Sequence, residues 1–237
     1  MRLLVLVPAY NESRSVAQVV CDLLADGFDV LVIDDGSDDD TASKASRAGA
    51  KVIRLAFNLG VGGALRAGFK FARLHGYEAV VQVDADGQHP VHGIKELVSA
   101  AEVMGADMVL GSRFASGRAT MPVSAPRRFA MRVLAHSASR ATNREITDAT
   151  SGFRLIREPL LSAFADKFAA NYLGDTFEAL VAAGRAGYSV HEIPADLRPR
   201  QSGVSSASTG RAITFSLKAI AVAALRLHPR IRPRNGV

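Results

Sequence analysis

Residues 3–41 read LLVLVPAYNESRSVAQVVCDLLADGFDVLVIDDGSDDDT, and this stretch decides the fold. Leu3–Val7 and Val30–Ile33 are short, uninterrupted apolar runs rich in β-branched residues, which is typical of strands buried on both faces of a parallel sheet. Between them, Ser15–Ala25 carries apolar residues at a helical period, with serines at its start that suit an N-cap. The stretch therefore predicts a strand, a crossover helix and a second, parallel strand.

The same alternation continues along the chain. It predicts a helix near Thr41–Ala48, a strand at Lys51–Leu55, a helix at Gly63–Leu74 and a strand at Ala79–Val83. Strands and helices in alternation indicate an α/β fold, here a Rossmann-like, doubly wound and mostly parallel sheet. With 237 residues the chain fits one such domain, whereas two independent domains would be cramped.

The second half of the chain is less regular. From Ser116 to Asp148 the apolar periodicity loosens and basic residues accumulate, which predicts a mobile segment. Gly187–Pro194 again has the pattern of a strand, and Gly210–His228 that of an amphipathic helix. We therefore expect a main domain at residues 1–208 with a helical extension and basic tail at residues 209–237. That extension would lie on an anionic membrane surface or pack on the sheet.

Composition narrows the class of protein. The formal net charge is +6 and the pI is near 9.8, which favours anionic partners such as nucleotides, lipid phosphates and membrane surfaces. The single cysteine, Cys21, favours a reducing, cytoplasmic location and is expected to be a small core residue. Runs of about 18 apolar residues are missing, so we expect no transmembrane helix.

Polar clusters follow each of the first four predicted strands. In order they are PAYNE at 8–12, DDGSDDDT at 34–41, NLGVGG at 58–63 and DADGQHP at 84–90. In doubly wound sheets ligands bind outside the carboxyl ends of the strands, so the four clusters predict one ligand site. The fingerprints of nicotinamide-binding Rossmann enzymes and of P-loop nucleotidases, GxGxxG and GxxxxGK[ST], do not occur.

The DADGQHP segment carries the strongest signal for a metal. Asp84 and Asp86 flank one alanine after an apolar strand, and Gln88 follows two residues later. Alternation in an extended segment would aim all three side chains to the same side, where their oxygens could hold Mg²⁺ or Mn²⁺. We expect such a metal to bridge a diphosphate and to stabilise a departing nucleoside diphosphate.

Two further groups belong to the same predicted site. Asp34 and Asp35 end the second strand, where carboxylates can accept hydrogen bonds from a ribose or a base, whereas Asp38 and Asp39 suit a turn and helix start. Gly63, in the glycine-rich loop, would allow close backbone approach and place amide donors near an anion.

Taken together, seven strings in order resemble family 2 glycosyltransferases of the GT-A fold, especially dolichol-phosphate and polyprenol-phosphate mannosyl- and glucosyltransferases. The match covers roughly Leu3 to Ser205. The strings are PAYNE (8–12), VIDDGSDDDT (32–41), NLGVGGALRAG (58–68), DADGQHP (84–90), GSRF (111–114), DATSGFR (148–154) and HEIP (191–194).

The resemblance implies a role for each matching residue. The residues expected to line the nucleotide pocket are Pro8, Tyr10, Glu12 and Asp35, and those expected around the metal are Asp84, Asp86 and Gln88. Arg113 and a downstream arginine, Arg127 or Arg128, would face the acceptor phosphate, and Arg200 would reach the donor diphosphate. The chain departs from the family pattern in RQSGVSS, which lacks the lysine that often follows the serine, and at Met131, near the position of a usual serine.

The implied reaction is inversion at the anomeric carbon by direct in-line attack of a polyprenyl phosphate on a GDP- or UDP-sugar. A lipid monophosphate is already an oxyanion near neutral pH, its second pKa being about 6, so positioning and charge neutralisation should dominate over base catalysis. Asp148 would then organise the acceptor loop, while Asp86 and the metal stabilise the leaving group. The resemblance also implies a cytoplasmic protein, peripheral at the inner face of the membrane, with a small membrane protein as a potential partner.

Two other functions fit the same residues. A family 2 transferase acting on a saccharide hydroxyl would require an additional carboxylate base, and the DATSGFR and GSRF strings weigh against it. A nonenzymatic binder of nucleotide sugars or nucleic acid would fit the basic charge, but nucleic acid is not expected because aromatic residues for base stacking are scarce. The sequence leaves open the sugar (mannose, glucose or N-acetylhexosamine), the nucleotide, the lipid length and the oligomeric state.

Overall fold

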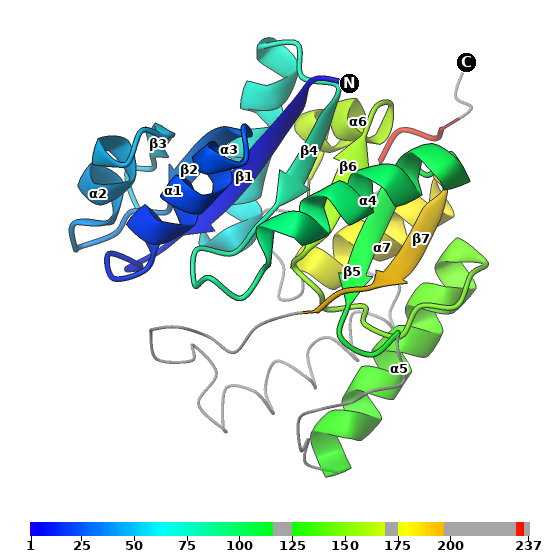
Figure 1. Ribbon diagram of the computed structural model, residues 1–237. Helices are drawn as coiled ribbons and strands as arrows, with labels where there is room; N and C mark the ends of the chain where they lie inside the picture. Colours follow the sequence, from blue (N-terminus) through cyan, green and yellow to red (C-terminus); the bar gives the residue numbers. More distant parts are fainter. Residues whose placement is uncertain (116–124, 169–174, 197–230, 235–237) are drawn as a thin grey trace.

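The computed structural model describes residues 1–115, 125–168, 175–196 and 231–234, and the strands in these ranges form one mixed sheet (Figure 1). The strands are β1 (Leu3–Ala9), β2 (Asp29–Asp34), β3 (Lys51–Arg54), β4 (Ala79–Gln82), β5 (Met108–Ser112), β6 (Arg154–Arg157) and β7 (Val190–Pro194). Their order is β3-β2-β1-β4-β6-β5-β7. All neighbouring pairs are parallel except those of β6, which runs antiparallel to both β4 and β5. The predicted doubly wound, mostly parallel sheet is confirmed.

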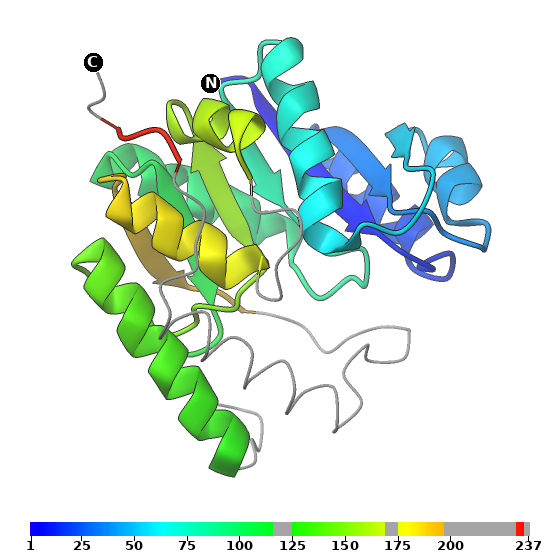
Figure 2. The ribbon, with the colours of Figure 1, turned by 180° about the vertical axis from the view of Figure 1, so that it is seen from behind.

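Helices cover both faces of the sheet. One face carries α1 (Val16–Ala25), α2 (Thr41–Arg47) and α4 (Val91–Met104), and the other carries α3 (Gly60–Leu74), α6 (Leu160–Asp166) and α7 (Asp175–Arg185) (Figures 1 and 2). The core is divided accordingly: Leu4 and Leu6 belong to the cluster under α3, whereas Val5 and Val7 belong to the cluster under α1. Successive side chains of a strand point to opposite faces, which explains why a strand buried on both faces is apolar throughout.

The elements predicted for residues 3–83 all occur, with small differences in their bounds. The helix predicted from Gly63 begins at Gly60. Ser15 occupies the N-cap position of α1, but its hydroxyl donates to Glu12 Oε2 at 3.1 Å instead of accepting from the helix backbone. The prediction for Cys21 was wrong, because this residue is exposed on the outer face of α1.

The segment from Ser116 to Asp148, where the apolar periodicity loosens, has regular structure over much of its length. Residues 125–142 form a long helix, α5 (Ala125–Thr142), which packs against α7; residues 116–124 lie outside the described ranges. Its buried residues recur every fourth position, at Ala130, Leu134 and Ala138. A stripe so narrow, and made mostly of alanine, does not stand out among the surrounding arginines and serines.

The end of the chain is only partly described. The helix predicted at residues 210–228 lies outside the described residues, as does most of the predicted 209–237 extension. Ile231 is buried in the core cluster of α7, and Arg234 Nε lies 2.8 Å from a buried oxygen, Asp107 Oδ2. Within the part of the chain that is described, no helix has the length and apolar character that a bilayer-spanning segment requires.

Candidate active site

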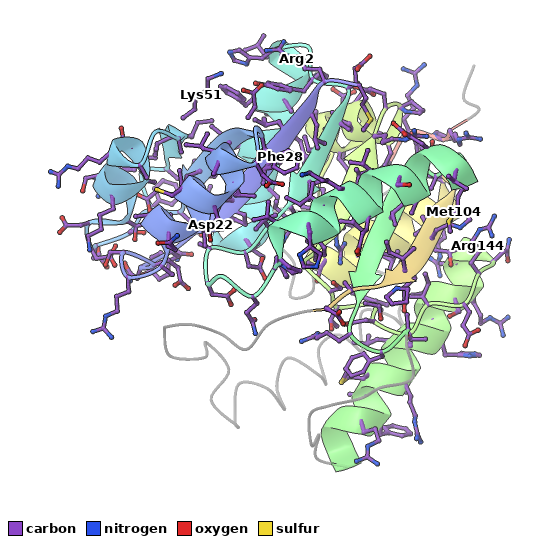
Figure 3. The ribbon with its side chains drawn as sticks, in the orientation of Figure 1. Arg2, Asp22, Phe28, Lys51, Met104 and Arg144 are labelled. Carbon is purple, nitrogen blue, oxygen red and sulfur yellow. The ribbon has the colours of Figure 1, made fainter. Side chains whose placement is uncertain are left out.

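One edge of the sheet gathers the predicted site residues. The parallel strands β1, β2, β4 and β5 end there, and the antiparallel strand β6 begins there. The segments after β1, β2, β4 and β5 therefore lie at the same edge of the sheet as the DATSGFR segment, which leads into β6. Arg2 lies at the opposite end of the sheet, near the start of β1 (Figure 3).

The two aspartates that end β2 have different roles. Asp34 is fully buried and structural, since its Oδ1 accepts the N–H of Ser37 at 3.1 Å and its Oδ2 lies 3.3 Å from Arg54 Nε. Asp35 is also buried, and its Oδ1 accepts the N–H of Leu59 at 2.8 Å. Burial raises the pKa of Asp35 and outweighs the backbone hydrogen bonds that lower it. Asp35 thus ties the loop after β2 to the start of α3.

The remaining residues of the predicted nucleotide pocket lie along β1 and α3. Pro8 is in β1, paired with Ile33, while Tyr10 after the strand is exposed. The N–H of Glu12 donates to the hydroxyl of Thr41 at 2.9 Å, which joins the loops after β1 and β2. Gly63 is buried in α3, where an added Cβ would lie 2.4 Å from Leu59 Cβ, so packing alone already requires glycine there. Its predicted contact with an anion stays a prediction.

The DADGQ segment is a turn, which corrects the predicted extended conformation. The strand ends at Gln82, the N–H of Gln88 folds back onto Asp86 Oδ1 at 3.0 Å, and Gly87 has φ +77°. Asp86 is buried, whereas 40% of the Asp84 side chain is exposed. The Asp86 carboxylate is thus anchored, whereas the Asp84 carboxylate remains accessible to ligands.

The donor set of this turn fits a hard divalent cation. In proteins Mg²⁺ is usually held by one or two carboxylates together with substrate phosphates and water, and Asp84, Asp86 and the Gln88 amide supply oxygens of that kind. The described ranges contain no cluster of three or more His, Cys, Asp or Glu, so an all-protein cage is not formed there. Gly152 leaves space at the open carboxylate, because an added Cβ would lie 3.1 and 3.2 Å from the two Asp84 oxygens.

Arg113 and Asp148 form the second half of the site. Arg113 Nε donates to Asp148 Oδ2 at 3.0 Å, and the Asp148 side chain is completely buried. Glu192 of β7 holds the same loop, since its Oε2 accepts the N–H of Thr147 at 2.7 Å and of Asp148 at 3.2 Å. The HEIP string signalled this position, but no role was predicted for Glu192. Asp148 is therefore held in place by the backbone bonds to Glu192 and pairs with Arg113.

A cavity of about 670 Å³ lies beside this pair, between α5 and the loop that precedes Asp148. Its walls are mostly apolar and basic, with one acidic residue, Glu145. They include Phe114, Arg128, Met131, Arg132, His136 and Ile146. Arg128 lines this cavity, and its contact with an acceptor phosphate stays a prediction, whereas the Arg127 side chain and all of Arg200 fall outside the described part of the chain.

Two buried charged residues were not predicted. Arg154, the last residue of DATSGFR, is fully buried, which lowers its pKa to about 10 even though Asp148 and Asp84 act in the opposite direction. It donates to the carbonyls of Ser151 and Thr176. Glu178 of α7 is also fully buried. The run EALVAAGRAG hid it, because a glutamate at a helix start usually faces solvent.

Comparisons with known proteins agree with this geometry. The model of the family "Glycosyl transferase family 2" matches residues 4–164. Polyprenol monophosphomannose synthase of Mycolicibacterium smegmatis is 32% identical over 218 residues, 87% of this chain and 81% of that protein. Undecaprenyl-phosphate mannosyltransferase of Micrococcus luteus is 31% identical over 219 residues, 89% of each chain.

Among solved structures, one of glucosyl-3-phosphoglycerate synthase from Mycobacterium tuberculosis, in complex with Mn²⁺, UDP and phosphoglyceric acid, superposes with a TM-score of 0.72 at 20% identity. The match covers 96% of this chain and 79% of that one. At this identity the likeness concerns the fold alone. The family match and the full-length relatives go further: this chain belongs to glycosyltransferase family 2 and is a glycosyltransferase with the GT-A fold.

Proposed function

We propose that this glycosyltransferase transfers a hexose from a nucleotide-diphosphate sugar to polyprenyl phosphate, with inversion at the anomeric carbon. One observation carries the proposal: an acidic turn at Asp84 and Asp86 shares its sheet edge with the Arg113–Asp148 pair and with a cavity of mixed apolar and basic lining. The acidic turn suits a metal-bound diphosphate, and the cavity suits a phosphate attached to a hydrocarbon chain.

The donor half of the site is the acidic turn with the loops after β1 and β2. Asp84, Asp86 and Gln88 would hold Mg²⁺ or Mn²⁺, which when bound neutralises the leaving diphosphate. The Mn²⁺ and UDP present in the structurally similar synthase support this assignment. Pro8, Tyr10, Glu12, Asp35 and Gly63 would surround the nucleotide, and Arg200 would contact the diphosphate.

The acceptor half needs positive charge more than it needs a base. A phosphate monoester with a second pKa of about 6 is largely ionised at pH 7 and is itself the nucleophile. Arg113, held by Asp148, and Arg128, on the cavity wall, can give the planar, charge-assisted hydrogen bonds that phosphate favours. The names of both bacterial relatives, which include a polyprenol or undecaprenyl phosphate, support this acceptor class.

The surface of α5 supports a position at the membrane. Between Ala125 and Thr142 the sequence contains arginines but no acidic residue, and Arg128, Phe129 and Arg132 are exposed on this helix. An aromatic ring among basic side chains suits the interface of an anionic leaflet. We therefore place the enzyme peripherally at the cytoplasmic face of the membrane, where a small membrane protein could join it. The basic extension at residues 209–237 stays part of this proposal.

The choice of acceptor can be tested directly. Purified protein is incubated with Mn²⁺ and radiolabelled GDP-mannose, UDP-glucose or UDP-N-acetylglucosamine, and with polyprenyl phosphate, phosphoglyceric acid or a saccharide as acceptor. We expect label in the organic phase from one donor with polyprenyl phosphate alone. Arg113→Gln should lower this transfer about 10- to 100-fold, since a charge-assisted contact to the phosphate is lost, whereas Arg47→Gln on α2 should not. Label in a water-soluble product would contradict the lipid acceptor.

A further inference from the structure

His89 closes the acidic turn onto Asp84. The N–H of Asp84 donates to His89 Nδ1 at 2.9 Å, and Asp84 Oδ2 lies 3.8 Å from His89 Nε2. Because Nδ1 accepts a hydrogen bond, the proton of the neutral ring is on Nε2, the nitrogen that faces the carboxylate. The imidazole thus fixes the backbone of Asp84 and directs an N–H towards its side chain.

Phe153 fixes the imidazole in turn. The two rings stack with centroids 4.8 Å apart and 27° between their planes, and both residues are buried. Two glycines leave room for the Phe153 ring: an added Cβ would lie 3.0 Å from its Cε1 at Gly93 and 2.5 Å from its Cδ1 at Gly111. In so close a packing the ring has little freedom, and neither does the imidazole stacked on it.

Gly152 lies against the carboxylate itself. An added Cβ there would lie 3.1 and 3.2 Å from the two Asp84 oxygens and 3.2 Å from Gln82 Nε2, a group that lies 3.5 Å from Asp84 Oδ1. Gly152 is not among the glycines with positive φ, so its backbone conformation does not require glycine. Glycine is needed there because the Asp84 carboxylate occupies the space that a side chain would fill.

We infer that His89 and Gly152 are positioning residues that set Asp84 for the metal. This inference rests on the metal role proposed for Asp84. The inference assigns the SGF part of DATSGFR to the donor half of the site. Gly152 makes room for the Asp84 carboxylate, and Phe153 holds His89, which orients that carboxylate. Metal ligands generally depend on such supporting groups, whose loss weakens metal affinity about 10- to 100-fold.

Mn²⁺ binding tests the inference without donor or acceptor present. The free Mn²⁺ signal in electron paramagnetic resonance gives the dissociation constant for the wild type, Gly152→Ala and His89→Phe, the last of which keeps the stack on Phe153. We expect each variant to raise the constant about tenfold or more. In an Asp84→Asn background neither should raise it further, because both act through that carboxylate.

Gly68→Ala is the matched control. Its added Cβ would lie 2.9 Å from Leu6 Cδ1, a similar crowding in the core under α3, and it should leave the Mn²⁺ constant unchanged whatever it does to the melting temperature. Unchanged Mn²⁺ affinity in both test variants would overturn the inference, and so would an equal loss in Gly68→Ala. Failure of the proposed function would give a different result. The dissociation constants for Mn²⁺ would change as expected in the variants, yet the wild type would transfer no sugar to lipid.

Discussion

Asp39 joins the loops that follow β1 and β2. Its Oδ1 accepts the N–H of Thr41 at 2.9 Å, and its Oδ2 accepts the N–H of Ser13 at 3.2 Å. The turn role predicted from the sequence is confirmed, but the bond to Ser13 was not predictable because it joins two separate loops. Burial acts to raise the pKa of Asp39, yet the hydrogen bonds from Thr41 and Ser13 prevail and lower it below the ordinary 3.8.

This lowered pKa makes the contribution of Asp39 depend on pH. A carboxyl group whose pKa is lower in the folded chain stabilises the fold above its ordinary pKa and loses that effect as the pH falls through the folded value. Because the Asp39 side chain is exposed and screened by water, Asp39→Asn should reduce the free energy of unfolding by only about 0.5 kcal/mol at pH 7, and by less near pH 3. Urea denaturation at both pH values measures this. Asp40→Asn is the control, since that side chain makes no capping bond; a deficit for Asp39→Asn that stays constant with pH would contradict the prediction.

Single residues also show what the sequence could not separate. Asp34 and Asp35 are adjacent residues of the same type, yet Asp34 contacts Ser37 and Arg54 whereas Asp35 faces the start of α3. In the same way, the sequence predicts Asp84 and Asp86 as a pair but assigns no role to His89, which lies in the same DADGQHP string. Its partner Phe153 comes from a distant string, and only the fold brings the two rings together.

At the scale of elements, apolar runs made the first half of the sheet predictable. Strands buried on both faces are continuous apolar runs in the sequence, so β1, β2 and β4 stand out, and the partly exposed edge strand β3 follows from the alternation of strands and helices. β6 does not stand out in the sequence, because it begins with the charged residue Arg154. Its antiparallel pairing with β4 and β5 also departs from the parallel pairing that the alternation of strands and helices predicts. α5 was missed for a related reason, its contact with α7 being made largely by small residues.

α5 and α7 approach each other closely at Gly184. A Cβ added there would lie 2.6 Å from the carbonyl oxygen of Ala141. Gly184→Ala should therefore push the two helices apart and destabilise the protein by about 1–3 kcal/mol, measured by urea denaturation. Because α5 carries Arg128, transfer to polyprenyl phosphate should fall as well. Gly187→Asn, at a positive φ with open space around the added Cβ, should change neither; an equally stable Gly184→Ala would contradict the packing described.

At the scale of the whole molecule, the chain returns to its own core near its end. Ile231 is buried, Tyr188 Oη donates to the carbonyl of Arg232 at 3.0 Å, and Arg234 pairs with Asp107. Part of the basic tail, for which the sequence left open a membrane surface or packing on the sheet, thus packs against the main domain. Composition could not reveal this, because an arginine on a membrane and an arginine in an ion pair look alike in sequence.

The sheet order also explains why separate strings act as one site. β6 lies between β4 and β5, so DATSGFR enters the sheet between the DADGQHP and GSRF segments. Asp84, Asp86 and Arg113 consequently all lie close enough to His89 to act on its pKa. Burial is the largest effect and lowers this pKa, while the two aspartates act to raise it and Arg113 acts to lower it. The proposed donor and acceptor halves of the site are therefore brought together by a single antiparallel strand.

Metal-dependent transfer of label into lipid tests the central claim most directly. Incorporation from the preferred nucleotide sugar into polyprenyl phosphate is followed while Mn²⁺ is titrated into wild-type enzyme and into Asp86→Asn, which keeps the side-chain size but removes the charge. We expect saturation with Mn²⁺ in the wild type, abolition by a chelator, and a fall of about 100-fold or more in the variant, since a metal contributes several kcal/mol to stabilising the leaving group. Equal transfer in the presence of chelator, or undiminished transfer by Asp86→Asn, would contradict it.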